Sequence, residues 1–249
     1  MIIALASLAV ILYLNGLNIS KVAPMMPAPM VSTARNWAGY VVTSNFAHPQ
    51  PVVEGVNGSW TVPSVTDIGI DSFSSCWVGV GGQYDDTLIQ VGTEQDFTGG
   101  SPSYSAWYEL LPADSVTIEI IRVSPGDHIT ASVTLVDPNL NVWTISIRDL
   151  TGGGSFQNNF TYDSRRLTAE WIVERPEING ALAPLANFGN ATFTNCQAMI
   201  SAKTGAITSF DYTYVTLDPE LVSGSYLQPV DVSPTANKGT QFTVNYIAT

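Results

Sequence analysis

The chain has 249 residues, of which only 12% are Asp, Glu, Lys or Arg, and its formal net charge is −12. Contacts to phosphates need lysine and arginine, and the chain has nine of these in all, so the composition argues against nucleic-acid binding. The length is sufficient for one large all-β domain. A surface kept soluble by uncharged polar groups suits an acidic extracellular setting, and a secreted protein that works at neutral pH is the alternative.

The chain begins with a segment rich in aliphatic residues. Residues 1–20 have the length and hydropathy of a secretory signal peptide or of an N-terminal membrane anchor. Residues 21–35 contain several prolines and are predicted to be a linker or a short pro-segment. Both interpretations of the first segment place the domain formed by residues 36–249 outside the cytosol. We therefore expect an extracellular protein, secreted or anchored, with no other contact to a membrane.

Strand patterns follow one another along the rest of the chain. Turn sequences such as Pro125-Gly126-Asp127 and Asp137-Pro138-Asn139 separate them, and no long window keeps apolar residues at helical spacing. Many short strands with such turns predict an all-β fold, an antiparallel β-sandwich of two large sheets. The expected strands are residues 36–42, 58–62, 76–80, 87–92, 104–110, 115–123, 128–137, 142–150, 156–162, 169–174, 191–199, 209–217 and 241–247.

The chain has two cysteines, Cys76 and Cys196, and both fall in expected strands. In an exported protein two cysteines can form a disulfide. They can equally be two small buried apolar residues. The sequence leaves both interpretations open.

Two of the expected strands carry polar side chains at alternate positions. Gln90 and Glu94 share one face of the first strand, and Glu170 and Glu174 share one face of the second, because side chains of a strand alternate between its faces. The opposite faces are apolar, as at Trp171. Amide and carboxyl groups on strands that are otherwise apolar indicate a site, whereas solvated outer-face residues are the alternative.

The remaining sequence argues against several common chemistries. The only histidines, His48 and His128, lie in a polar loop and after a turn, with no sign of a nucleophile and an orienting carboxylate. We find no zinc-ligand spacing, no phosphate-binding glycine loop and no matched pair of Asp-Thr-Gly-like turns. Carboxyl and amide chemistry is what remains, without a metal or another cofactor.

Seven short motifs occur in a fixed order and together carry a family resemblance. The motifs are Asn36-Trp37-Ala38-Gly39-Tyr40, Ser59-Trp60-Thr61-Val62-Pro63, Trp77-Val78-Gly79-Val80-Gly81, Leu88-Ile89-Gln90-Val91-Gly92, Tyr104-Ser105-Ala106-Trp107-Tyr108-Glu109, Ala169-Glu170-Trp171-Ile172-Val173-Glu174 and Asn187-Phe188-Gly189-Asn190-Ala191-Thr192-Phe193. With these motifs the chain resembles the glutamic peptidases, the eqolisin family of acid endopeptidases, from about Asn36 to about Asn195.

The resemblance implies a β-sandwich of the concanavalin A-like or jelly-roll type with a Gln–Glu catalytic dyad on its concave face. The family's glutamine is Gln90 here, and its glutamate is Glu174. The family usually has Asp four residues after the glutamine, where this chain has Glu94. It also has Asp where this chain has Gly81, so one supporting carboxylate is unaccounted for. Trp77 matches a family tryptophan near the site.

In the implied mechanism, the Glu174 carboxylate takes a proton from a water, the Gln90 amide donates to the oxyanion, and Glu174 returns the proton to the leaving amine. We expect a monomer that cleaves polypeptides, with an acidic optimum and no inhibition by pepstatin, which targets an aspartyl pair. The expected substrate-binding or supporting residues are Trp77, Glu94, Tyr104, Trp107 and Glu109.

The main alternative is a carbohydrate-binding or glycoside-hydrolysing β-sandwich. Such proteins also place tryptophans and carboxylates on an open sheet, but a glycosidase needs two carboxyl groups at the scissile bond. Position 90 would then be acidic, whereas this chain has an amide there. A catalytically inactive binding module is a third alternative, against which the presence of both Gln90 and Glu174 argues.

Overall fold

A computed structural model describes residues 30–217 and 230–247 of the chain. The predicted signal or anchor segment, residues 1–20, and the first part of the predicted linker lie outside the described residues. Within the described part of the chain, no helix has the length and hydropathy needed to cross a membrane.

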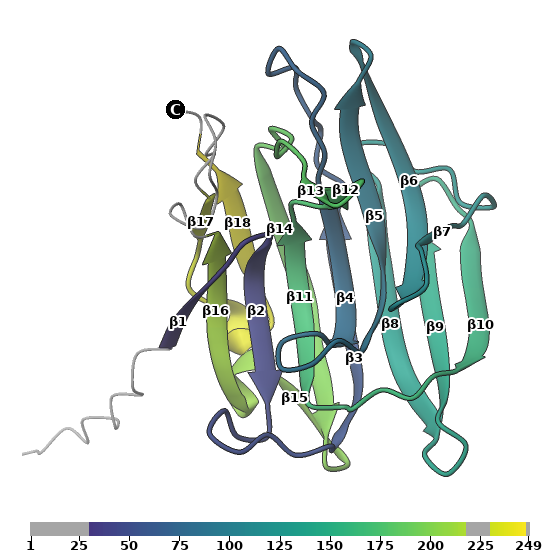
Figure 1. Cartoon of the computed structure of the whole chain (residues 1–249), viewed down its shortest axis with the longest axis vertical. Helices are drawn as coiled ribbons and strands as arrows, with labels where there is room; N and C mark the ends of the chain where they lie inside the picture. The colour runs from purple at the N-terminus through teal and green to yellow at the C-terminus, as the bar shows by residue number, and fades with distance from the viewer. Residues whose placement is uncertain (1–29, 218–229, 248–249) are drawn as a thin grey trace, which may run out of the picture.

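The fold consists of two large sheets packed face to face, as predicted (Figure 1). The first sheet contains, in spatial order, β1 (Met30–Ala34), β16 (Asp211–Leu217), β2 (Trp37–Thr43), β11 (Thr168–Glu174), β4 (Ser75–Gly81), β5 (Leu88–Thr98), β6 (Ser101–Leu110) and β7 (Val116–Thr117). The second contains β10 (Ser155–Thr161), β9 (Val142–Asp149), β8 (His128–Asp137), β3 (Val53–Thr61), β14 (Asn190–Ile200), β18 (Phe242–Tyr246) and β17 (Val230–Val232), with β15 (Lys203–Ala206) paired to β14.

Three short pieces complete the described fold. The strands β12 (Glu177–Ile178) and β13 (Ala181–Leu182) form a separate hairpin that directly follows β11. The 3₁₀ turns η1 (Ile207–Ser209) and η2 (Asn237–Gly239) are the only helical elements in the described ranges. All pairs in the two large sheets are antiparallel except β1 with β16.

Strand alternation divides the first sheet into a core face and an outer face. Trp171 and Val173 of β11 belong to the main core between the sheets, whereas Ile172, between them, belongs to a small apolar cluster with Trp77 and Trp107. The second cluster therefore lies on the face of the first sheet that points away from the second sheet. Gln90 and Glu174 lie on this outer face, because they alternate with the core residues Val91 and Val173 on their strands.

The short strands β12, β13, β15 and β17 were not expected from the sequence, and two further segments differ from the prediction. Residues 30–34, the end of the predicted linker, form the edge strand β1. The strand expected over residues 115–123 is reduced to Val116–Thr117, because the alternation breaks after it. Ile118 and Ile121 are both buried and Ile120 is 67% exposed, so turns rather than a strand deliver these side chains to the core.

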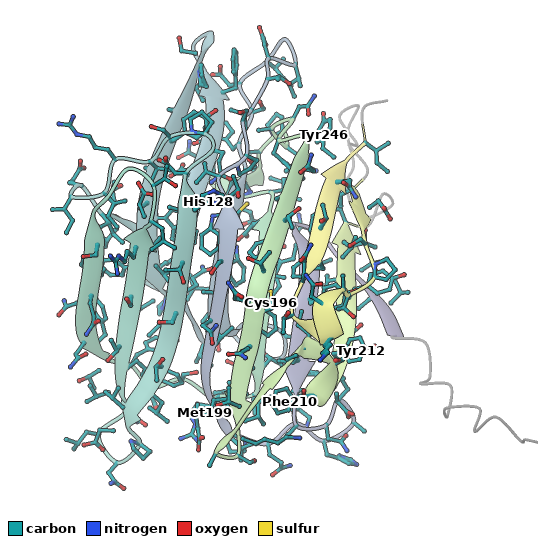
Figure 2. All side chains as sticks on the ribbon, turned by 180° about the vertical axis from the view of Figure 1, so that it is seen from behind. His128, Cys196, Met199, Phe210, Tyr212 and Tyr246 are labelled. Carbon is teal, nitrogen blue, oxygen red and sulfur yellow. The ribbon has the colours of Figure 1, made fainter. Side chains whose placement is uncertain are left out.

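Both cysteines are free thiols buried in the main core. Cys76 lies on β4 of the first sheet, and Cys196 lies on β14 of the second sheet (Figure 2). The structure thus agrees with the interpretation of two small buried residues and not with a disulfide. His128, labelled in the same view, is exposed, and its Nδ1 lies 3.0 Å from the Thr61 hydroxyl.

Candidate active site

A cavity of about 360 Å³ opens on the outer face of the first sheet, over the four neighbouring strands β11, β4, β5 and β6. It brings together residues that are far apart in the sequence. The lining residues are Asn36, Trp37, Ser75, Leu88, Gln90, Glu94, Trp107, Glu109, Leu111, Ser115, Glu174, Pro176 and Glu177. Of the predicted site residues, Gln90, Glu94, Trp107, Glu109 and Glu174 therefore share one cavity.

Glu174 is held at the end of β11 by two side-chain donors. The Asn36 amide donates to Oε1 at 2.7 Å, and the Trp77 indole N–H donates to Oε2 at 2.8 Å. Asn36 immediately precedes β2, whose Trp37 is opposite Glu174 in the ladder, and Trp77 is on β4, on the other side of β11. With one donor on each side of β11, the plane of the Glu174 carboxyl group is fixed.

The environment of Glu174 favours its protonated form. Burial raises the pKa of this carboxyl from 4.5 to about 7, although the hydrogen bonds from Trp77 and Asn36 and the proximity of the Trp37 indole act to lower it. The negative charge of Glu109 raises the pKa further. A carboxyl group with a pKa of about 7 can both give and take a proton near neutrality, which suits a general acid or base.

Gln90 lies on β5, directly opposite Glu109 on β6. Its Nε2 donates a hydrogen bond of 2.5 Å to Oε2 of Glu109. The side chain of Gln90 is 3% exposed, and its Oε1 is buried without a hydrogen-bond partner among the described residues. A primary amide has two N–H donors, so one remains for a group in the cavity.

Glu109 and Glu94 are the other carboxyl groups that β5 and β6 bring to the cavity. Burial raises the pKa of Glu109, the hydrogen bond from Gln90 lowers it, and the charge of Asp114 raises it. Glu94 accepts a hydrogen bond of 3.1 Å from the Ser105 hydroxyl. Its neighbour on the same strand face, Asp96, has a pKa raised to about 9, first by burial and then by its contact with Glu94.

The predicted aromatic residues divide between the two faces of the sheet. Trp107 lines the cavity and Trp77 lies beneath it in the small apolar cluster. Tyr104 does not reach the cavity, because it lies an odd number of positions from Trp107 on β6 and so points to the opposite face. It packs against the main core, and its hydroxyl accepts a hydrogen bond from the Val65 N–H at 3.2 Å. The structure therefore places Tyr104, which was predicted to be a supporting residue, outside the cavity.

The backbone at Gly81 leaves no room for the aspartate that the family has at this position. Gly81 has φ of 103°, and a Cβ at this position would lie 2.2 Å from the Thr87 carbonyl oxygen, so no other side chain fits there. Glu170 is fully buried next to it and does not line the cavity. Burial raises the pKa of Glu170 well above its ordinary value, against the effects of Thr168 and the Gly81 N–H.

Eight residues of the cavity wall were not predicted as site residues, namely Asn36, Trp37, Ser75, Leu88, Leu111, Ser115, Pro176 and Glu177. Asn36 and Trp37 were part of a recognised motif but were assigned no role, because only the pairing of β2 with β11 brings them to Glu174. Pro176 and Glu177 reach the cavity because the hairpin β12–β13 follows β11 immediately. The sequence placed Asn36 at the start of the strand expected over residues 36–42, but it gave no sign that the partner of Asn36 is Glu174.

The site combines Glu174, a half-buried carboxyl group with a pKa raised to about 7, with the Gln90 amide, which has a free N–H. Such a pair can move a proton and stabilise a developing oxyanion, as acyl transfer to water requires. In the ranges that the structure describes, no cluster of three or more His, Cys, Asp or Glu is arranged to hold a metal ion.

Comparisons with known proteins point to one family. The sequence pattern of the Peptidase A4 family matches residues 35–246. The chain is 30% identical to aspergillopepsin-2 of Aspergillus niger over 85% of its length and 77% of that protein. Its fold is similar to that of aspergilloglutamic peptidase from Aspergillus niger, at 30% identity and a TM-score of 0.60 over 71% of this chain and 99% of that one. Scytalido-glutamic peptidase with a transition state analog inhibitor has a similar fold at 24% identity, with a TM-score of 0.69 over 86% and 98% of the two chains.

Proposed function

Because the chain belongs to the Peptidase A4 family, the glutamic peptidases or eqolisins, we propose that this endopeptidase hydrolyses peptide bonds with Gln90 and Glu174 as its catalytic dyad. The observation that carries the proposal is that both side chains line one cavity, where Glu174 is held by two donors and has a raised pKa. No other carboxyl group of the cavity has this combination of contacts.

The pKa of Glu174 changes the starting state of the mechanism inferred from the sequence. That mechanism begins with the carboxylate, but a carboxyl group with a pKa of about 7 is protonated at acidic pH. An enzyme active in acid therefore starts with protonated Glu174. Gln90 does not titrate, so Glu174 is the only ionisable member of the dyad.

In the first step Glu174 acts with both of its oxygens. Its O–H gives a proton to the scissile carbonyl oxygen, while its other oxygen takes a proton from the water that attacks the carbonyl carbon. A C–O bond forms, the C=O π bond breaks, and the carboxyl group is protonated before and after. The free N–H of Gln90 donates to the carbonyl oxygen as charge develops, an interaction worth about 3–4 kcal/mol at a comparable site.

In the second step the tetrahedral intermediate collapses. Glu174 gives its proton to the amide nitrogen, and the C–N bond breaks. The carboxylate then takes a proton from one hydroxyl of the intermediate as the new C=O bond forms. The product acid and the amine leave, and Glu174 is protonated again, so the cycle needs no cofactor.

The setting of the enzyme follows from the same proposal. A dyad that works in its protonated form suits an acidic compartment outside the cell, so we place the protein among secreted or surface-anchored monomeric peptidases. Membership of this peptidase family favours peptides over glycans as substrates. The low content of charged side chains agrees with solubility in acid.

We expect the purified protein to hydrolyse an acid-unfolded protein at pH 4 and to keep its full activity with pepstatin present. The reason is that pepstatin targets an aspartyl pair, which this cavity does not have among the described residues. Release of new amino groups measures the reaction, and a panel of glycans under the same conditions should give no reducing sugar. Inhibition by pepstatin, or hydrolysis of glycans in place of protein, would overturn the proposal.

A further inference from the structure

The hydrogen bond between Gln90 and Glu109 gives a second carboxyl group a defined place beside the dyad. The two residues are direct partners across β5 and β6, and Nε2 of Gln90 lies 2.5 Å from Oε2 of Glu109. The other amide atom, Oε1, is buried without a partner among the described residues, so this bond is the contact that sets the rotation of the amide. Without it, the amide nitrogen and oxygen could exchange places.

We propose that Glu109 is a positioning residue for the Gln90 amide: it holds one N–H, so that the other stays directed to the scissile carbonyl oxygen, where negative charge develops in the transition state. This inference rests on the proposed function of Gln90 and Glu174. An amide rotated by half a turn would present its oxygen to the oxyanion, and two partial negative charges would repel each other. The acceptor at Glu109 disfavours that rotation, because it would then face the amide oxygen.

Glu109 has a second, electrostatic effect on the dyad. Its negative charge is one of the causes that raise the pKa of Glu174. The other ionisable groups near it are also acidic, and none of the residues that line the cavity is Lys, Arg or His. These groups are Glu94 on β5, Glu174 on β11, Glu177 on β12 and Asp114 after β6.

Two variants separate the hydrogen bond from the charge. E109L removes the acceptor and the charge together, and should lower kcat by roughly 10²-fold with KM little changed, because the oxyanion donor is no longer directed. E109Q keeps an acceptor oxygen and should retain most of kcat. In both variants the pH at which activity falls should move below that of the wild type, because the charge that raises the pKa of Glu174 is gone.

The experiment measures kcat, KM and the pH profile on one peptide, with thermal melting to check folding. E119Q is the matched control: Glu119 is exposed, does not line the cavity and should leave all three values unchanged. Equal kcat in E109L and the wild type, or an unshifted profile in E109Q, would overturn the inference while leaving the dyad intact. A wild-type protein without peptidase activity would instead refute the proposed function itself.

Discussion

Replacing Glu174 by glutamine should abolish peptide hydrolysis, with a loss in kcat on the order of 10⁴-fold. Glutamine keeps the shape of the side chain and one acceptor oxygen, so the hydrogen bonds from Asn36 and Trp77 can partly persist. It cannot exchange a proton with the water or the leaving amine. Steady-state hydrolysis of a peptide at pH 4 measures the effect, and near-ultraviolet circular dichroism checks that the fold is retained.

The matched variant on the other side of the dyad is Gln90→Ala. It removes the oxyanion donor and leaves the proton carrier, so we expect a smaller loss, about 10²–10³-fold. E170Q serves as a comparison on the same strand face as Glu174, since Glu170 does not line the cavity. A Glu174→Gln variant with near wild-type kcat would refute the dyad, and so would an E170Q variant as inactive as Glu174→Gln.

The second large effect concerns stability, which should fall as the pH rises from about 4 to 9. Four carboxyl groups have raised pKa values, the buried Asp96 and Glu170 and the half-buried Glu109 and Glu174, so the folded state binds more protons than the unfolded chain over this range. A raised pKa gives stability that is complete below the unfolded value and lost as the pH passes the folded value.

The pKa values of Glu174 and Asp96 set the pH range and the size of this loss of stability. For Glu174 the shift from 4.5 to about 7 corresponds to about 3 kcal/mol, lost between these two pH values. Asp96, with a pKa of about 9, extends the loss to higher pH. Because folded domains are stable by only about 5–15 kcal/mol, losses of this size should unfold the protein in mild alkali.

Denaturant unfolding at pH 4 and pH 8 measures this dependence. The Glu174→Gln variant cannot titrate at this position, so its stability should change less between the two pH values than that of the wild type, by about 3 kcal/mol. Because this variant should lack peptidase activity, it should not digest itself during the measurement. Exposed Glu119, replaced by glutamine, should leave the dependence unchanged. Equal stability of the wild type at both pH values would show that these carboxyl groups are not held protonated by the fold.

Strand alternation was sufficient to predict which side chains share the outer face of the first sheet. The predicted grouping of Gln90 with Glu94 and of Glu170 with Glu174 agrees with the two faces of β5 and β11. The same rule, applied to β6, would have removed Tyr104 from the site, because Tyr104 and Trp107 lie three positions apart. Tyr104 was included in the predicted site because strand alternation was not applied to this strand.

Other features depend on contacts between distant segments and could not be predicted from the sequence. The donors to Glu174 come from Asn36 and Trp77, and only the sheet order β2-β11-β4 places them on either side of it. The pKa of Glu174 is raised to about 7 by burial in the assembled cavity, which the sequence alone does not show. The apolar residues near Ile120 suggested a strand. Their burial by turns depends on tertiary packing, which the sequence does not show.

The pH dependence of kcat/KM for the wild-type enzyme tests the central claim most directly, because it reports the ionisation of the free enzyme. Initial rates on a peptide between pH 2 and pH 8, taken before any unfolding, should stay high in acid and then fall with the loss of one proton, about tenfold per pH unit, above a pKa of about 7. An activity that rises through pH 7, or a fall that involves two protons, would contradict a dyad in which protonated Glu174 is the only ionisable member.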